Sequence, residues 1–157
     1  MPLYRHLNKI EFSNLTHPKD VSEFIKAIYF GQNAGFNDFI LDFSKTATSF
    51  PNASVPLAGL LEYYRNNGIS FTIQQSSDII RATKLLTPIE LSNENDLNGL
   101  NVLNKVFKFY NSDHVFWLVN AFLEELNQSD KFEKGVLEGL EWCLNEVMDN
   151  VIQHSNT

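Results

Sequence analysis

Two kinds of hydrophobic periodicity alternate along the first 86 residues. Apolar residues at every second position, or in short continuous runs, are typical of β-strands, whereas apolar residues three or four apart are typical of helices. The strand-like segments are residues 3–12, 39–43 and 69–74, and helix-like segments begin near Pro18, Leu57 and Asp78. This alternation predicts an α/β domain whose sheet is at least partly parallel.

The run Phe-Ile-Leu-Asp-Phe at residues 39–43 indicates the central strand of that sheet. It is almost continuously apolar and is bounded by turn residues, as in a strand that is buried on both faces. We therefore expect the sheet to carry helices on both faces, or a heavy helical cover on one face.

Composition changes abruptly over residues 87–101, which are rich in Pro, Ser, Asn, Glu, Asp and Gly. Such a segment is typical of a domain boundary. We expect a first domain over residues 1–86, a linker over 87–101 and a second segment over 102–157. The second segment is predicted to hold a strand over residues 102–110 and helices over about 113–126 and 137–154.

The last predicted helix carries both a polar edge and an apolar stripe. Glu146, Asn150 and His154 recur at every fourth residue, so each is rotated only about 40° round the helix from the one before. A carboxylate, an amide and an imidazole therefore lie in a row. A broad buried stripe is expected on the apolar side, from Val136, Leu140, Cys143, Leu144, Val147, Met148 and Val151.

Composition and charge narrow the classes of function. The 157 residues are 43% hydrophobic, which is typical of globular proteins. The formal charge is −7, and 12 Lys and Arg among 19 acidic residues provide no basic face for nucleic acid. No stretch approaches the roughly 20 apolar residues of a membrane span. The single cysteine, Cys143, favours a reducing compartment, so we expect a cytoplasmic protein without nucleic-acid or membrane partners.

The segment Glu-Val-Met-Asp-Asn-Val-Ile-Gln-His, residues 146–154, resembles the N box of the GHKL family of ATPases and kinases. That signature is Glu-x-x-x-Asn on a helix, often followed by His one turn later. The preceding strand and helix also resemble the start of the GHKL domain, particularly its anti-sigma-factor kinase branch. The resemblance covers the last third of the chain and implies an ATP-binding, regulatory function in bacterial signalling.

The resemblance implies a role for each residue of the polar edge. Asn150 would give an oxygen to the Mg²⁺ that bridges the ATP phosphates, Glu146 would act as the general base, and His154 would lie near the phosphates. These roles suit the residue types, because Mg²⁺ takes oxygen ligands and keeps several waters, and phosphoryl transfer needs a positioned base. The alternative is that the three residues form only the solvated edge of an amphipathic helix.

Other sequence elements of the GHKL family do not occur in this chain. The family's Asp-x-Gly-x-Gly box and Gly-rich lid follow the N box, and no other phosphate-binding glycine loop is present. We therefore expect ATP and Mg²⁺ to be cofactors of a longer parent protein, an ATPase or Ser/Thr protein kinase. These 157 residues alone are expected to bind neither cofactor and to be inactive.

The first 86 residues resemble a STAS domain, the fold of anti-sigma-factor antagonists. Leu41-Asp-Phe-Ser44 is similar to the central STAS strand, and residues 50–61 are similar to the loop and helix that follow it. At the position of the family's phosphorylated serine this chain has Ala53, and Ser54 is the only hydroxyl nearby. Phosphate is tolerated at a helix N-terminus, but an N-cap is the simpler role for Ser54.

Together these features predict a STAS-like mixed sheet with helices, followed by a truncated α+β segment of the GHKL type. Proteins are the expected partners, and a homodimer is one option. The alternative is a non-catalytic protein-interaction module that binds no nucleotide, in which the last two helices pack back on the sheet.

Overall fold

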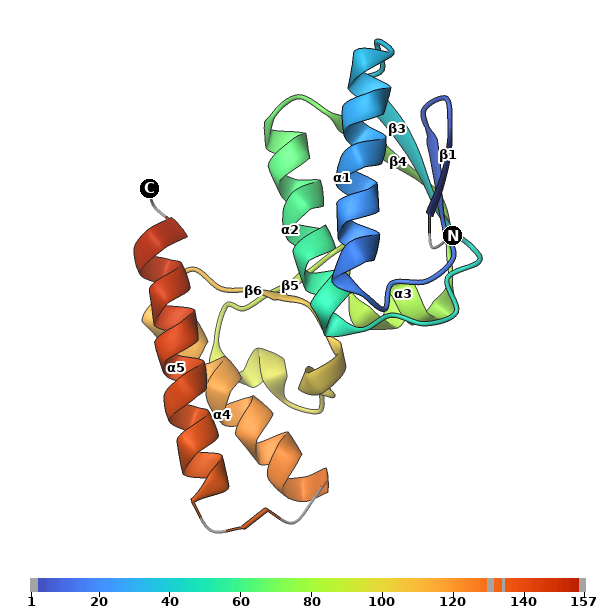
Figure 1. Ribbon diagram of the computed structural model, residues 1–157. Helices are drawn as coiled ribbons and strands as arrows, with labels where there is room; N and C mark the ends of the chain where they lie inside the picture. The colour runs from blue at the N-terminus through green and yellow to red at the C-terminus, as the bar shows by residue number, and fades with distance from the viewer. Residues whose placement is uncertain (1–2, 130–131, 134, 156–157) are drawn as a thin grey trace. The chain divides into compact units, whose positions relative to one another are not determined.

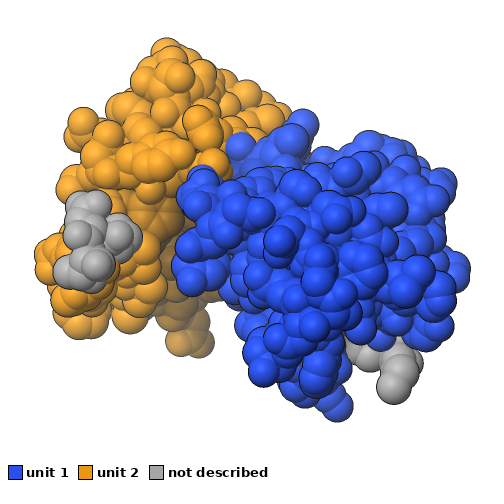
Figure 2. Space-filling model, turned by 90° about the horizontal axis from the view of Figure 1, so that it is seen from above, with its two compact units in different colours: residues 1–88 blue, residues 89–157 orange. Residues whose placement is uncertain are grey.

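The computed structural model describes residues 3–129, 132–133 and 135–155 (Figure 1). The chain divides into two compact units, unit 1 over residues 1–88 and unit 2 over residues 89–157, which Figure 2 shows in different colours. Unit 1 contains a mixed four-stranded sheet, and the described part of the chain contains five α-helices. The predicted α/β class is therefore confirmed.

The sheet of unit 1 has the strand order β1-β2-β3-β4. Its strands are β1 (Leu3–His6), β2 (Lys9–Phe12), β3 (Asp38–Phe43) and β4 (Ser70–Ser76). β1 and β2 pair antiparallel, whereas β2, β3 and β4 are parallel. The single strand predicted over residues 3–12 is thus a hairpin, because the chain turns at Leu7, whose φ of 55° lies in the left-handed region.

Helices connect the parallel strands, as the alternating pattern predicts. α1 (Pro18–Asn33) joins β2 to β3, α2 (Pro51–Asn66) joins β3 to β4, and α3 (Asp78–Thr83) follows β4. α1 begins with a capping box, in which the backbone N–H of Lys19 donates to His17 Nδ1 and that of His17 donates to Asp20 Oδ2.

The hydrophobic core of unit 1 lies between one face of the sheet and the pair α1 and α2, which lie side by side in Figure 1. Side chains that alternate along the strands fill this face and are almost completely buried: Ile10, Phe12, Phe39, Leu41 and Phe43. The intervening residues Lys9, Glu11 and Thr72 are polar. The sheet therefore has one heavy helical cover, the second of the two arrangements expected from the sequence.

Unit 2 begins with short elements and ends with two long helices. β5 (Ile89–Glu90) pairs in parallel with β6 (Phe107–Lys108), and two 3₁₀ helices, η1 (Glu94–Leu97) and η2 (Val102–Asn104), lie between them in the chain. α4 (Ser112–Ser129) and α5 (Val136–Ser155) pack along each other (Figure 1). The core of this unit is formed by Leu91, Leu97, Val102 and Leu118, with Phe107, Trp117, Phe122 and Met148 packed against it.

Two sequence-based expectations for this region differ from the structure. Within the segment expected as a linker, Leu91 and Leu97 are buried in the core of unit 2. The strand predicted over residues 102–110 is limited to Phe107–Lys108, and η2 occupies its beginning. The physical reason is a long-range contact, because the backbone N–H of Val102 donates to the Glu125 carboxylate at 2.7 Å instead of pairing with a neighbouring strand.

Candidate functional site

The helix α5 positions the three residues of the polar edge. Leu144, Met148 and Ile152 on one side of α5 are half-buried, and Met148 packs against the core of unit 2. This packing fixes which side of the helix faces outward. Glu146, Asn150 and His154 lie on that outward side and are exposed.

The geometry of a helix sets the spacing within this row. At a rise of about 1.5 Å per residue, neighbouring members lie about 6 Å apart along the axis, and the whole row spans about 12 Å. Mg²⁺ binds oxygen at about 2.0–2.1 Å and in phosphate sites keeps several waters, so it needs few ligands from the protein. Asn150 fits that need, since Mg²⁺ in phosphate sites uses one or two protein oxygens. Within the described residues, no group of three His, Cys, Asp or Glu side chains is placed to hold a metal ion.

The broad buried stripe predicted for α5 is only partly buried, and this expectation was wrong for its outer half. Leu140, Leu144 and Met148 are half-buried, but Val136, Val147 and Val151 are 46%, 62% and 49% exposed. At about 100° per residue, Val136 and Val147 lie about 60–80° round the helix from Leu144, whereas Val151 lies only about 20° from it and is exposed near the end of α5. We call Val136, Val147 and Val151 the outer stripe of α5. It runs beside the polar edge.

A further residue of α5 differs from expectation. Cys143, interpreted from sequence as a core thiol, is exposed and free. The helical spacing of Trp142 among apolar residues favours a role as a core or interface anchor; at 67% exposure it lies outside the core, and the interface role stays a prediction. The other tryptophan, Trp117, does belong to the core region, and it stacks on the buried His114 with ring centroids 5.4 Å apart. α4 alone therefore covers too little of α5 to bury its second apolar side.

The loop that resembles the STAS regulatory site has no accessible hydroxyl at the corresponding place. α2 begins at Pro51, and its N-cap is Phe50, so Ser54 lies inside the first turn. Ser54 is buried, and its hydroxyl donates to the Phe50 carbonyl at 3.1 Å. The N-cap role assigned to Ser54 from sequence is therefore wrong, because the helix already begins at Pro51, three residues before Ser54. Ala53 beside it is fully buried.

A cluster of charged side chains lies on the polar face of the sheet in unit 1. Lys9 Nζ lies 2.8 Å from Glu11 and 3.0 Å from Asp42, and Lys45 Nζ lies 3.3 Å from Glu11. Burial alone would raise the pKa of Asp42. The bond from the Ser44 N–H and the contact with Lys9 outweigh burial and lower this pKa to about 2. The cluster is internally neutralised, so its chemistry is that of structural support.

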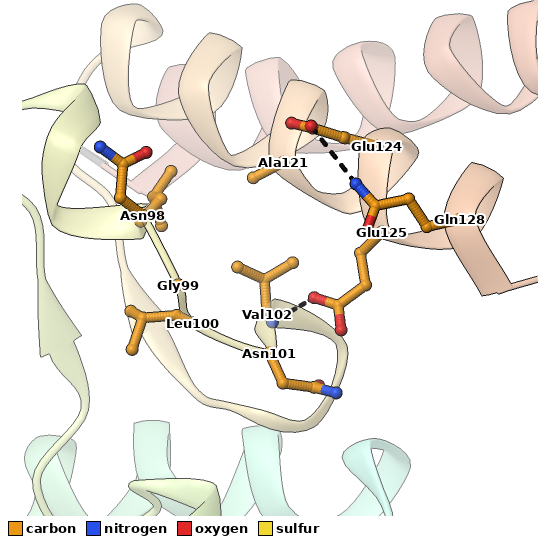
Figure 3. Close-up of a pocket in the computed structure, with 10 residues that line it drawn as sticks. Asn98, Gly99, Leu100, Asn101, Val102, Ala121, Glu124, Glu125 and Gln128 are labelled. Atoms are coloured by element: carbon orange, nitrogen blue, oxygen red, sulfur yellow. Dashed lines mark hydrogen bonds between the residues drawn. The ribbon is translucent and has the colours of Figure 1, made fainter.

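A pocket of about 410 Å³ opens between the loop of residues 97–102 and one face of α4 (Figure 3). Glu124, Glu125 and Gln128 line it from the helix, and Asn98 and Asn101 line it from the loop. Sequence reasoning missed these residues because it took the loop for a linker. The available signal was the spacing of Ala121, Glu124, Glu125 and Gln128, which places them on one face of a helix.

No protein-family model, curated protein or solved structure matches this chain. The assignment of the polar edge therefore rests on the residues themselves and on their exposure. Across the described residues, no helix has the length and apolar character needed to cross a membrane.

Proposed function

We propose that this chain belongs to an ATP-dependent signalling regulator of the anti-sigma-factor kinase type. Unit 1 would be its STAS-like protein-interaction domain, and unit 2 the leading part of its GHKL ATP-binding domain. Asn150 would hold Mg²⁺, Glu146 would act as the base, and His154 would lie near the phosphates.

One observation carries this proposal: the polar edge of α5 and its outer stripe are both exposed and lie side by side on one helix. An ATP-binding helix needs its polar edge open to the nucleotide and its apolar side available for the rest of the domain. Exposure of Val147 and Val151 supports such a role, since exposed apolar groups that follow one another on a surface mark an interaction site.

The proposed ATP-binding domain of the same protein is a more suitable binding partner for the outer stripe than a second copy of α5. α5 carries Glu138, Glu141, Glu146 and Asp149 and has no Lys or Arg. A second copy would bring together two helices of net negative charge, and this overall repulsion disfavours pairing. A homodimer through α5 is therefore the weaker option, and we assign the stripe to further residues of the parent protein.

The proposal is tested by hydrolysis measurements on the longer parent protein that it implies. Glu146→Ala should lower ATP turnover by about 100-fold or more, because a positioned base contributes about that much, while ATP affinity changes little. Glu141→Ala removes an exposed carboxylate from another side of α5 and should leave turnover unchanged. Normal turnover in Glu146→Ala would refute the assignment of the base. An extended protein that binds partners but no ATP would favour the non-catalytic module.

A further inference from the structure

The pocket of unit 2 lies apart from the polar edge of α5, and none of the proposed ATP-binding residues lines it. Its volume of about 410 Å³ lies within the range of small-molecule sites, which is about 300–1,000 Å³. Figure 3 shows its two walls, one from α4 and one from the loop of residues 97–102.

The helical wall is built by side chains that share one face of α4. Ala121, Glu124, Glu125 and Gln128 follow the i, i+3, i+4, i+7 spacing of such a face. Glu125 is fixed in place, because one carboxylate oxygen accepts the 2.7 Å bond from the Val102 N–H. Gln128 Nε2 donates to Glu124 Oε1 at 3.4 Å, and both of these side chains are exposed at the same wall (Figure 3).

The loop wall leaves room for a ligand. Gly99 has a φ of 72°, a conformation that L side chains rarely adopt, and a Cβ there would meet no atom within 4 Å. Leu97 and Val102, which are almost fully buried, give this wall an apolar base, and Asn98 and Asn101 add amide groups.

The charge of the residues that line the pocket indicates which charge its ligand carries. Two carboxylates line the pocket, and none of its lining residues is Lys, Arg or His. Ionised carboxylates accept hydrogen bonds and donate none. They would repel an anion, whereas a cationic group with several N–H donors would form charge-assisted hydrogen bonds with them. The apolar base suits the methylene stem that joins such a group to the rest of its molecule.

We propose that this pocket binds an organic cation, namely a guanidinium or ammonium group carried on an aliphatic stem. The cationic group lies between Glu124 and Glu125, and the stem lies over Leu97 and Val102. The chemistry is shared by free amines and by Arg or Lys side chains of a partner protein. The site makes no use of ATP, so it holds whether or not the proposed ATPase function does.

NMR titration of this 157-residue chain with agmatine, a small guanidinium amine, tests the proposal. Amide shifts should be largest at residues 97–102 and 121–128, with a dissociation constant of about millimolar size for a pocket so open to solvent. The double variant Glu124→Gln/Glu125→Gln keeps an acceptor for the Val102 N–H and should raise that constant about tenfold or more.

The matched control is Glu138→Gln/Glu141→Gln, which removes the same charge from exposed positions of α5 and should change the constant less than about twofold. Equal weakening by both double variants would overturn the proposal, because it would show only general attraction to an acidic surface. Binding of the neutral analogue butylurea as tightly as agmatine would also overturn it.

A blocked pentapeptide with one arginine between alanines separates the two sources of the cation. Butylguanidine, which like the peptide carries a single positive charge, is the reference for this comparison. Tighter binding of the peptide than of butylguanidine identifies a protein partner, and tighter binding of butylguanidine identifies a free small-molecule cation. Each result supports the site when the shifts map to the pocket. Absence of shifts with either probe at tens of millimolar would refute it.

Discussion

Lys9 Nζ lies 3.0 Å from Asp42 Oδ2 and joins the neighbouring parallel strands β2 and β3. Asp42 is only 8% exposed although it carries a charge. Its second oxygen accepts the Ser44 N–H at 2.9 Å, so the carboxylate also fixes the turn that leaves β3. The charged pair therefore stabilises the C-terminal end of β3, where the loop to α2 begins.

This arrangement predicts an acid-sensitive contribution to stability. The pKa of Asp42 is lowered from 3.8 to about 2 in the folded protein, so its stabilising effect is present above pH 4 and is lost as the pH falls from about 4 to 2. Asp42→Asn should lower the free energy of unfolding by about 1 kcal/mol near pH 7. Solvent screening of Lys9 keeps this effect small. Urea unfolding at about pH 7 and 2.5 measures it. A cost that is unchanged at the lower pH would contradict the prediction.

A glycine in α1 is required by close packing on the sheet. A Cβ at Gly31 would overlap the ring of Phe39, which is buried and cannot move aside without disturbing the core. We expect Gly31→Ala to destabilise unit 1 by about 1–3 kcal/mol. Gly59→Ala in α2 is the matched control, because a Cβ there meets nothing within 4 Å, and it should stabilise by about 0.5–1 kcal/mol. Equal effects of the two changes in thermal unfolding would refute the packing assignment.

The start of α2 should not work as a phosphorylation switch through Ser54. Ser54→Asp places a charge at a buried position and should destabilise unit 1 by about 2–4 kcal/mol. Asn52→Asp introduces the same charge at an exposed position of the first turn, where the helix dipole favours it. That variant should be as stable as the native protein. Full stability of Ser54→Asp in urea unfolding would show that the site is accessible after all.

The two sides of α5 should respond differently to polar substitution in this 157-residue chain. Leu144→Ser removes a half-buried side chain that faces α4 and should cost about 1–2 kcal/mol. Val147→Ser changes the outer stripe, which is 62% exposed, and should cost less than about 0.5 kcal/mol. In the longer parent protein that the proposal implies, the ATP-binding domain would cover Val147, and the same substitution should then become costly. Equal costs for Val147→Ser in both lengths of chain would contradict the assignment of the stripe.

Much of unit 1 follows from its sequence, because strong periodicity and glycine positions agree with each other there. The run of residues 39–43 marks the central strand, and Gly68 with a φ of 82° ends the turn before β4. The hairpin at Leu7 was missed, since a leucine in the left-handed region carries no sequence signal.

Unit 2 was less predictable because long-range contacts decide its local structure. Val102 lies in a segment whose apolar residues favour a strand. Its backbone N–H nevertheless donates to the carboxylate of Glu125, which is 23 residues away in the chain. Similarly, the spacing of apolar residues on α5 identifies the helix but cannot tell which part of the stripe α4 covers. The polar edge was located from its four-residue period alone, and its exposure follows from the packing of Leu144 and Met148.

The most direct measurement for the proposed function is Mg²⁺-dependent ATP binding by the extended parent protein that the proposal implies, compared with its Asn150→Ala variant. The native protein should bind ATP in the presence of Mg²⁺, and Asn150→Ala should raise the dissociation constant about tenfold or more, because an oxygen ligand of the ion is lost. Asn145→Ala, an amide on the other side of α5, should bind like the native protein. Failure of the native extended protein to bind ATP, or equal binding by Asn150→Ala, would contradict the account.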